Sequence, residues 1–257
     1  MQADTHPDQL PFVAPCRVLG AAEPLRWLAL GWRDLCAAPL PSLSYGVLLA
    51  ALGAGIALVT WKLGQLALYV GLASGFVFLG PFLALGLYSI SHQLGVGRKP
   101  TLGYSLRQGS AHIKDTAVLG LCLLIVLLVW ARAATIMSVF RPDEAFPDWR
   151  DLVPYFGIGS VIGAMFCAIV FAVTAFSLPM LLDRRADAIT AVVTSVNACL
   201  RNKRVVFTWA ALIGVCVVLG FATAFVGFIV LMPLVGHATW HGYRATIDAS
   251  RWPPTHG

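Results

Sequence analysis

Long apolar tracts, separated by short segments that hold most of the charges, set the pattern of this chain. A helix needs about 20 apolar residues to cross the hydrocarbon core of a bilayer, and lipid offers no partner to a free backbone amide or carbonyl. The tracts therefore predict membrane-spanning helices. We place six of them, over residues 43–61, 66–92, 116–137, 155–182, 205–221 and 224–244.

The last two predicted spans have the least room, because both helices and their turn must lie between Val205 and Arg244. The small residues of 220–227 (GFATAFVG) suit a turn between two helices. One long helix in place of this pair would give five spans. The sequence leaves both possibilities open.

A shorter segment precedes each pair of spans. Two of these segments carry apolar residues at helical spacing, which are Leu25, Leu28, Trp32 and Leu35 in the first and Ile189, Val192, Val196 and Leu200 in the third. Pro24 suits a first helical turn, and Asp187 is a candidate N-cap. The middle segment, 102–115, has a weaker pattern. All three are too short and too charged to span, so we expect them at the cytoplasmic membrane interface.

Three tracts end in a proline in the same way, at 75–81 (GFVFLGP), 173–179 (VTAFSLP) and 227–233 (GFIVLMP). Each proline removes one helical hydrogen bond, so we expect kinks at Pro81, Pro179 and Pro233. The predicted fold is an all-α membrane protein of three repeated units. Each unit is an interfacial helix followed by a helical hairpin whose inward helix is kinked. Such kinks could surround a central space, although proline is also tolerated in membrane helices without that role.

The repeat also predicts the domain organisation. We expect a flexible cytoplasmic N-terminus at 1–22, a six-helix membrane domain at 23–248 and a cytoplasmic tail at 249–257. The repeat units cover about 23–100, 101–187 and 188–248. The first twenty residues hold two Asp, three Pro and no continuous apolar core, so they are not typical of a cleavable signal.

Basic residues indicate the orientation, because Lys and Arg collect on the cytoplasmic side of short loops. With the N-terminus inside, fourteen of them fall on inner segments, namely Arg17, Arg26, Arg33, Arg98, Lys99, Arg107, Lys114, Arg184, Arg185, Arg201, Lys203, Arg204, Arg244 and Arg251. Four lie on or near the outer side, namely Lys62, Arg132, Arg141 and Arg150. We therefore expect both termini in the cytoplasm.

Composition agrees with a membrane protein and excludes other classes. Hydrophobic residues make up 58% of the chain and charged residues 12%, with a mean hydropathy of +0.79. Soluble domains have about a quarter of their residues charged. The net charge of +6 does not predict nucleic-acid binding, because the basic residues lie between apolar tracts and not on a basic and aromatic face. The six cysteines show no C-x-x-C pair, so neither a zinc site nor a disulfide framework is predicted.

Arg132 is the charge that lies clearly inside a predicted span, and ionisable residues within the membrane are functional candidates. It lies near the outer end of its helix and close to Trp130. A long basic side chain at that depth can reach the headgroups. We favour this role over a buried ion pair or a substrate contact.

His237 and His241 (HATWH) are four residues apart, so they share a helix face and could hold a metal together. Haem would need histidines on opposing helices, and His92 is the nearest candidate partner. The motif lacks a third ligand and the glutamate of a zinc hydrolase. We therefore favour an interfacial pair flanked by Trp240 and Tyr243, with no metal or cofactor.

Asp183, Arg184 and Arg185 directly follow the fourth predicted span. An acid beside two bases at the interface favours a local charge pair that anchors the topology. A role in gating or in binding lipid headgroups is the alternative. The remaining sequence shows no Ser-His-Asp arrangement, phosphate loop or paired carboxylates, so we predict no catalytic residue.

Four motifs occur in order, namely GWRDL (31–35), PSLSYG (41–46), GFVFLGPFLALGLYSIS (75–91) and FSLPMLLDRRADAITAVVTSV (176–196). Together they resemble a family of prokaryotic integral membrane proteins of uncharacterised function, some of which carry the label cytochrome c oxidase subunit. The resemblance implies no active site. A haem-copper core would need several histidines on spanning helices, and only His237 and His241 lie well within a span. This chain is therefore not expected to carry the metals of an oxidase.

These patterns predict a non-catalytic integral protein of the bacterial inner membrane that binds lipids, partner proteins or both. One alternative is a transporter or channel for a small apolar or amphipathic molecule, which would need a cavity lined by the three prolines. Another is an accessory subunit of a respiratory oxidase, which would need His92 to converge with the last two histidines named above. No nucleic-acid partner is expected, and the sequence does not define the ligand or the oligomeric state.

Overall fold

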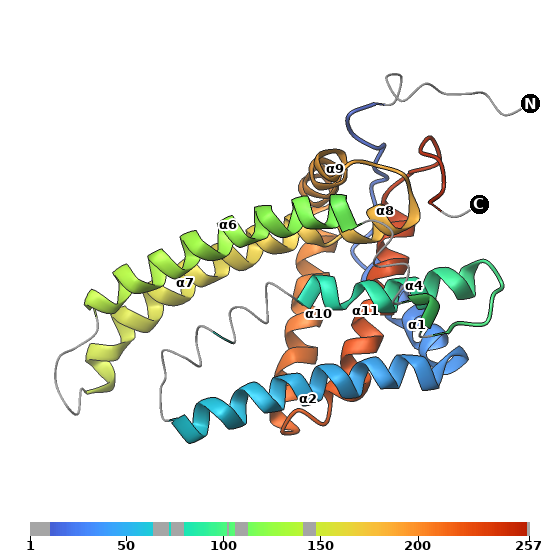
Figure 1. Ribbon diagram of the computed structural model, residues 1–257. Helices are drawn as coiled ribbons and strands as arrows, with labels where there is room; N and C mark the ends of the chain where they lie inside the picture. The colour runs from blue at the N-terminus through green and yellow to red at the C-terminus, as the bar shows by residue number, and fades with distance from the viewer. Residues whose placement is uncertain are drawn as a thin grey trace, which may run out of the picture.

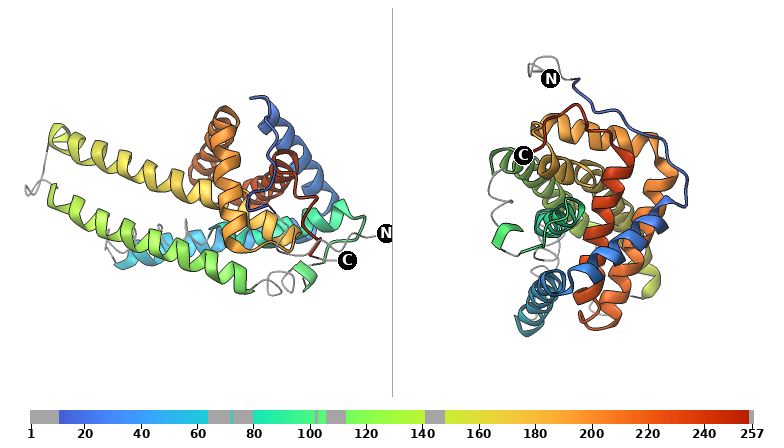
Figure 2. Two further views of the ribbon diagram at one scale, coloured as in Figure 1. Left: turned by 90° about the horizontal axis from the view of Figure 1, so that it is seen from above. Right: turned by 90° about the vertical axis from the view of Figure 1, so that its right-hand side faces the viewer.

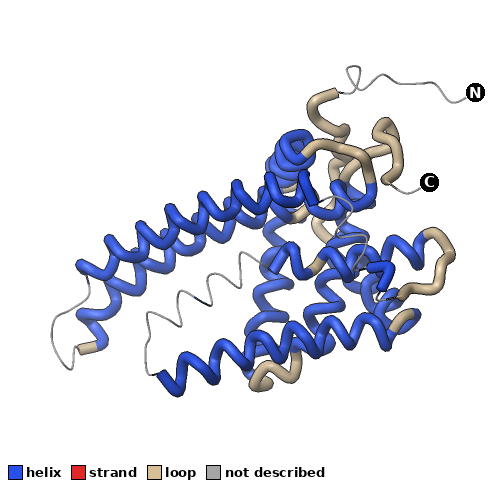
Figure 3. Tube along the Cα trace, viewed as in Figure 1, coloured by secondary structure: helices blue, strands red, loops and turns tan. Residues whose placement is uncertain are grey.

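The computed structural model describes residues 11–63, 72, 80–101, 103–105, 113–140 and 148–255. Over these ranges the chain is helical, with isolated β-bridges in place of strands (Figures 1 and 3). The helices are α1 (Glu23–Ala37), α2 (Pro39–Leu63), α4 (Leu85–Gly95), α6 (Ile113–Met137), η2 (Ser138–Phe140), α7 (Trp149–Thr174), α8 (Ser177–Asp183), α9 (Ala188–Arg201), α10 (Lys203–Ala222) and α11 (Phe228–Thr246). The all-α fold class predicted from the apolar tracts is confirmed.

Four helical stretches within the described ranges have the length and apolar composition to cross a membrane, namely Pro39–Leu63, Lys114–Met137, Leu152–Asp183 and Lys203–Ala222. They coincide with the first, third, fourth and fifth predicted spans. About half of the second predicted span, residues 66–71 and 73–79, lies outside the described residues, and α4 forms its last part. The sixth corresponds to α11, which is a helix but is not among these four. Six spans and the threefold repeat therefore stay predictions.

A tight turn at residues 223–227 separates α10 from α11, where small residues predict one. Ala224 and Phe225 have φ angles of 49° and 70°, in the left-handed region that costs free energy for a side chain with a Cβ. Phe225 packs its ring against Phe221 and Phe228, with centroids 5.4 and 5.9 Å apart. This aromatic packing offsets the cost of the turn, so the last two helices form a hairpin.

The central helix of the bundle is α11, which packs against α1, α2, α4 and α10. Gly31 of α1 and Gly46 of α2 allow the closest approaches, because a Cβ at either position would meet the backbone of α11. Gly46 faces the carbonyl of Ile229. That carbonyl has no helical partner, because residue 233, four positions on, is a proline without an N–H. The glycine therefore lets α2 cover the part of α11 that Pro233 leaves open.

The helices α6 and α7 form a hairpin that extends away from the other helices (Figures 1 and 2). Large apolar side chains are exposed along both of them, including Leu121, Leu128, Phe156 and Val161. A surface of this kind is stable only when lipid or another apolar surface covers it. The hairpin thus has the character expected of a membrane-embedded pair.

A break at residues 175–176 separates α7 from α8, three to four residues before Pro179. The Ser195 hydroxyl of α9 accepts from the Phe176 N–H at 3.1 Å and donates to the Ala172 carbonyl at 2.7 Å. In a continuous α-helix these two backbone groups would bond to each other. Ser195 therefore replaces one hydrogen bond of the ladder with two of its own.

The short helix α1 buries a different face from its apolar stripe. Trp27 and Leu35 are buried against the bundle, whereas Leu25 and Trp32 of the stripe are about half exposed. Large apolar residues that point away from the protein suit a helix lying on a membrane surface. Two members of the stripe thus face outward, while Leu28 and Leu35 contact the rest of the protein.

The helix α9 also buries a face other than its apolar stripe. Ala191 is fully buried, while Ile189 and Leu200 of the apolar stripe are about 60% exposed. The predicted N-cap is confirmed, because the Thr190 N–H donates to the Asp187 carboxylate at 2.9 Å. Burial raises the pKa of Asp187, but the hydrogen bonds from Thr190 outweigh this effect and lower the pKa overall.

Residues 11–20, which the sequence places in a flexible segment, pack against α9 and α11. The Arg17 N–H donates to the Thr246 carbonyl at 2.8 Å, and the Asp248 N–H donates to the Pro15 carbonyl at 2.9 Å. Trp252 of the C-terminal segment is buried as well. The described parts of both terminal segments therefore belong to the folded body, because their backbones pair with each other.

Replacement of Ser195 by alanine tests the bridge between α7 and α8. The Phe176 N–H and the Ala172 carbonyl would lose their partner in an apolar surround, so we expect a loss of about 1 to 3 kcal/mol in the free energy of unfolding. Thermal or SDS unfolding in detergent, followed by circular dichroism, measures it. Ser44→Ala is the control, because the exposed Ser44 hydroxyl bonds only to the Leu40 carbonyl of its own helix. Equal stability of the two variants would contradict the role of Ser195.

Candidate functional site

A partly enclosed cavity of about 210 Å³ lies where five helices meet. Its walls include Leu49 of α2, Leu87 of α4, Phe171 of α7, Ile213 of α10 and Val235 of α11. The lining is mostly apolar and carries no charged side chain among the residues that form it. A dry apolar cavity of about 150 Å³ is known to accept benzene, so this one can hold a slightly larger apolar group.

Few polar groups face this cavity. Thr174 and Thr239 line it, and their hydroxyls donate to the carbonyls of Val170 and Val235 at 2.8 Å. Each hydroxyl proton is therefore used in a hydrogen bond to a backbone carbonyl of its own helix. Trp209 lines it with an indole that is only 1% exposed.

The proline-bearing segments converge on the cavity. Pro81 is part of the lining, and Thr174 and Ala175 line it a short distance before Pro179. Met232, the neighbour of Pro233, lines it from α11. The cavity thus lies between the three segments, although only the first of the prolines touches it.

A chain of buried and partly buried polar side chains lies beside the cavity and links four helices. His237 of α11 is fully buried between two serines, with Nε2 2.9 Å from Ser42 Oγ of α2 and Nδ1 2.7 Å from Ser91 Oγ of α4. Ser91 also bonds to the carboxylate of Asp34 in α1. The His241 Nε2 lies 2.9 Å from the same carboxylate. The order of the chain is therefore Ser42, His237, Ser91, Asp34 and His241.

The direction of each hydrogen bond follows from Asp34. An ionised carboxylate only accepts, so both Ser91 and His241 donate to it. The single proton of Ser91 is then used, and its oxygen accepts from the Nδ1–H of His237. The Nε2 of a neutral His237 accepts in turn from the Ser42 hydroxyl. Every member is satisfied, and the chain ties α1, α2 and α4 to the central helix.

The environment of Asp34 keeps it ionised. Burial raises its pKa, but hydrogen bonds from His241 and Ser91 more than compensate, and the pKa falls below the ordinary value of 3.8. The stabilisation that this carboxylate provides is complete above that value and is lost as the pH falls through the lower pKa of the folded state. Around neutral pH the chain is therefore intact.

A second cluster surrounds Asp183 at the end of α8. Its carboxylate is buried and accepts from the Tyr243 hydroxyl at 2.9 Å and from Arg184 Nε at 3.1 Å. Arg244 Nη1 and His92 Nε2 lie 3.6 and 3.9 Å from it. Arg184 also donates to a backbone carbonyl of the C-terminal segment. The cluster therefore joins α4, α8, α11 and that segment. These contacts suit the predicted charge anchor.

Four of the predicted site residues come together around α11, and one does not. His237 and His241 belong to the polar chain, while Asp183 and Arg184 form the second cluster. Arg132 is exposed on α6, in the hairpin that extends away from the bundle (Figure 1). It therefore has no part in either cluster.

The three histidines do not converge on one point. His92 faces Asp183 and packs edge-on against Trp240, whereas His237 lies between its two serines and His241 faces Asp34. Within the described ranges no group of three or more His, Cys, Asp or Glu residues is arranged to hold a metal ion. The convergence that the oxidase-subunit alternative requires is absent from this structure.

Sequence reasoning missed Asp34, Ser42 and Ser91 as members of a site. A signal was present, because each lies in a different motif of the family resemblance, namely GWRDL, PSLSYG and the YSIS end of the third motif. Polar residues beside apolar tracts need a buried partner. The partners are as many as 207 residues away, so a local pattern does not identify them.

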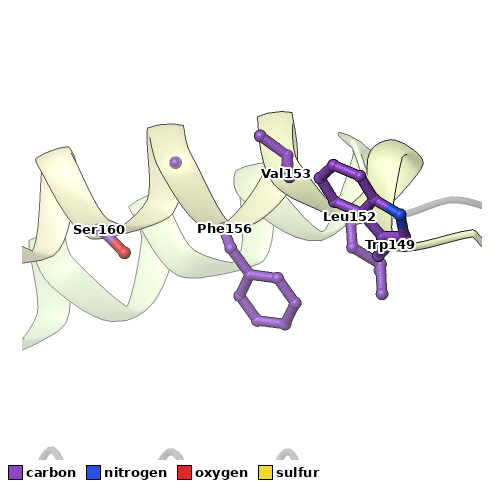
Figure 4. Close-up of a pocket in the computed structure, with 6 residues that line it drawn as sticks. Trp149, Leu152, Val153, Phe156 and Ser160 are labelled. Carbon is purple, nitrogen blue, oxygen red and sulfur yellow. The ribbon is translucent and has the colours of Figure 1, made fainter.

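A second apolar hollow lies on the outer face of α7, lined by Trp149, Val153, Phe156 and Ser160 among others (Figure 4). All of its lining residues come from one helix, and their side chains stand apart from one another. It is therefore a groove along an exposed helix and not an enclosed site. The cavity at the centre of the bundle is the better candidate for a specific ligand.

The comparisons agree with a membrane protein. Residues 68–183 match the model of a family described as Predicted integral membrane protein (DUF2189), a family of unknown function. This segment holds the third motif and the beginning of the fourth. No curated protein and no solved structure matches the chain. With its apolar helices, the chain is an integral membrane protein.

Replacement of Asp34 by alanine tests the polar chain. His241 and Ser91 would lose a charged acceptor, so we expect a loss of about 2 to 4 kcal/mol in the free energy of unfolding near neutral pH. Unfolding in detergent measures it, and the difference from the natural protein should shrink below the ordinary carboxyl pKa. Asp148→Ala is the control, because Asp148 is exposed and makes no side-chain cap bond. A pH-independent difference would contradict a role for the charge.

Proposed function

We propose that this protein binds a small apolar or amphipathic molecule, such as a membrane lipid, in the cavity at the centre of its helices and carries out no catalysis itself. The observation that supports this proposal is the apolar cavity of about 210 Å³ between the three proline-bearing segments. Well-packed helices would leave no such space, because a void forfeits packing contacts. A ligand that fills it would recover those contacts.

The polar chain supports a structural role more than a chemical one. Ser42 and His237 are fully buried, and both ring nitrogens of His237 lie within hydrogen-bond distance of a serine of the chain. A nucleophile and its base need room for a substrate next to them. We assign these residues to holding the helices around the cavity.

We place the protein in the bacterial inner membrane with six spans and both termini in the cytoplasm. α1 and α9 support this arrangement, because each presents apolar residues outward and carries basic residues at its end or along its face. Lipids would surround the bundle, and the exposed α6–α7 hairpin could also contact a membrane-protein partner.

Transport of the bound molecule is the second candidate function. The convergence of the proline-bearing segments favours it, because helices that are broken or kinked near a binding site can rearrange around it. A role as an accessory subunit of an oxidase has less support, since it rests on the label of some related proteins. Release of the ligand across a membrane would distinguish transport from binding alone.

Reporter fusions test the topology. Alkaline phosphatase is active only outside the cytoplasm and green fluorescent protein only folds well inside it, so we expect fluorescence and no phosphatase activity for fusions at either terminus. A fusion after residue 140 should show the opposite pattern. Termini on opposite sides would contradict an even number of spans.

Ala175→Leu tests the cavity. Ala175 is buried and lines the cavity, so the larger side chain would occupy part of the space. We expect the purified variant to carry at least about threefold less bound ligand than the natural protein, as mass spectrometry of extracted small molecules and lipids measures, which corresponds to a modest loss of binding free energy. Ala51→Leu, at an exposed position of α2, is the matched control.

The outcomes separate binding from general membrane association. A molecule lost from Ala175→Leu but kept by Ala51→Leu supports the proposal. Identical contents in both variants and in the natural protein would show that the molecules only coat the surface. Accumulation and helicity of each variant establish that the comparison is between folded proteins.

A further inference from the structure

We infer that the cavity selects a neutral apolar molecule that carries a carbonyl oxygen, and that the indole N–H of Trp209 recognises this oxygen. The inference rests on the proposed function, because it concerns the occupant of the same cavity. It adds the chemical class of that occupant and the residue that recognises it by a hydrogen bond.

Trp209 combines two properties. It lines the cavity from α10, and it is 1% exposed. Its Nε1 has no hydrogen-bond acceptor among the described residues. A buried donor without a partner costs free energy, so most such groups in folded proteins are satisfied by protein, water or ligand. A ligand with an acceptor would supply the missing partner.

The rest of the lining determines what kind of acceptor fits. Thr174 and Thr239 have committed their protons to helix carbonyls, so their oxygens can only accept further bonds. Tyr88 also lines the cavity and can donate or accept. With no charged side chain in the lining, an anionic acceptor such as a free carboxylate would be buried without compensation. A neutral carbonyl on an apolar molecule accepts a hydrogen bond from Trp209 and brings no charge into the cavity.

Trp27 provides an internal comparison. It is also 1% exposed, its Nε1 is also unpartnered within the described part, and its ring stands edge-on to that of Trp209 with centroids 5.8 Å apart. It does not line the cavity. The two indoles therefore share burial and packing but differ in access to the space that a ligand would fill.

The test uses the full-length protein in detergent and two probes of nearly equal size. Acetophenone and ethylbenzene differ by a carbonyl oxygen, and both are only slightly larger than benzene. We expect Trp209→Phe to weaken binding of acetophenone roughly 3- to 10-fold and to leave that of ethylbenzene unchanged, as a neutral hydrogen bond predicts. Trp27→Phe should change neither affinity. Comparing proteins with the same probe cancels the partition of the probe into detergent.

Each outcome decides a different point. Suppose that the natural protein binds both probes and that Trp209→Phe weakens the binding of both equally or of neither. The indole then does not recognise the carbonyl, while the proposed cavity function stands. If neither probe binds the natural protein, the cavity function itself fails and takes the inference with it. Should Trp209→Phe not fold, the natural protein alone still decides, because a preference for ethylbenzene after correction for partition would overturn the inference.

Two sources could supply the carbonyl, namely the acyl ester of a membrane lipid and a free apolar ketone. Mass spectrometry of molecules that co-purify with the natural protein, Trp27→Phe and Trp209→Phe separates them. The species depleted in Trp209→Phe alone is the source. Co-purifying molecules that all lack a carbonyl would overturn the inference.

Discussion

A polar atom buried in this protein has no access to bulk water, and apolar side chains and lipid offer it no partner, so most such atoms bond to groups within the chain. The requirement explains features that are far apart in the sequence. Ser195 joins the backbone groups on either side of the break between α7 and α8, and Asp34 accepts from two side chains on other helices. Gly46 covers the carbonyl that Pro233 leaves without a partner. At the α7–α8 break and at Pro233, a specific residue of a neighbouring helix fits the altered backbone.

The central helix concentrates these arrangements. One face of α11 contributes His237 and His241 to the polar chain, and another contributes Tyr243 to the cluster around Asp183. Residues of the same turns, including Gly236 and Thr239, form part of the cavity wall. Movement of α11 would therefore disturb both clusters and the cavity together. The cavity and the polar chain are therefore physically coupled through this helix.

Local patterns in the sequence predicted the helices well and their partners poorly. Apolar tracts located four helices with the character of spans, and the N-cap at Asp187 and the turn before α11 follow from local chemistry. The buried face of α1 did not follow, because Trp27 packs on the bundle while Trp32 of the apolar stripe is exposed. Helical periodicity shows which residues share a face, but in a membrane both protein and lipid can cover an apolar face.

The candidate site shows the same limit. His237, His241, Asp183 and Arg184 could be singled out because charged and imidazole groups are rare in apolar tracts. Their partners depend on contacts between distant helices, which periodicity does not encode. The cavity itself has no sequence signature, because it arises from how side chains of five helices fail to fill one space.

The pairing between residues 15–17 and 246–248 has a consequence for biogenesis. A ribosome makes the first of these segments long before the second, so the two cannot pair until residues 246–248 have been synthesised. Completion of the fold is thus a late step that joins segments from opposite ends of the sequence. Joining those ends by a short linker, with new ends opened at the tip of the α6–α7 hairpin, would convert this slow closure into an early local event.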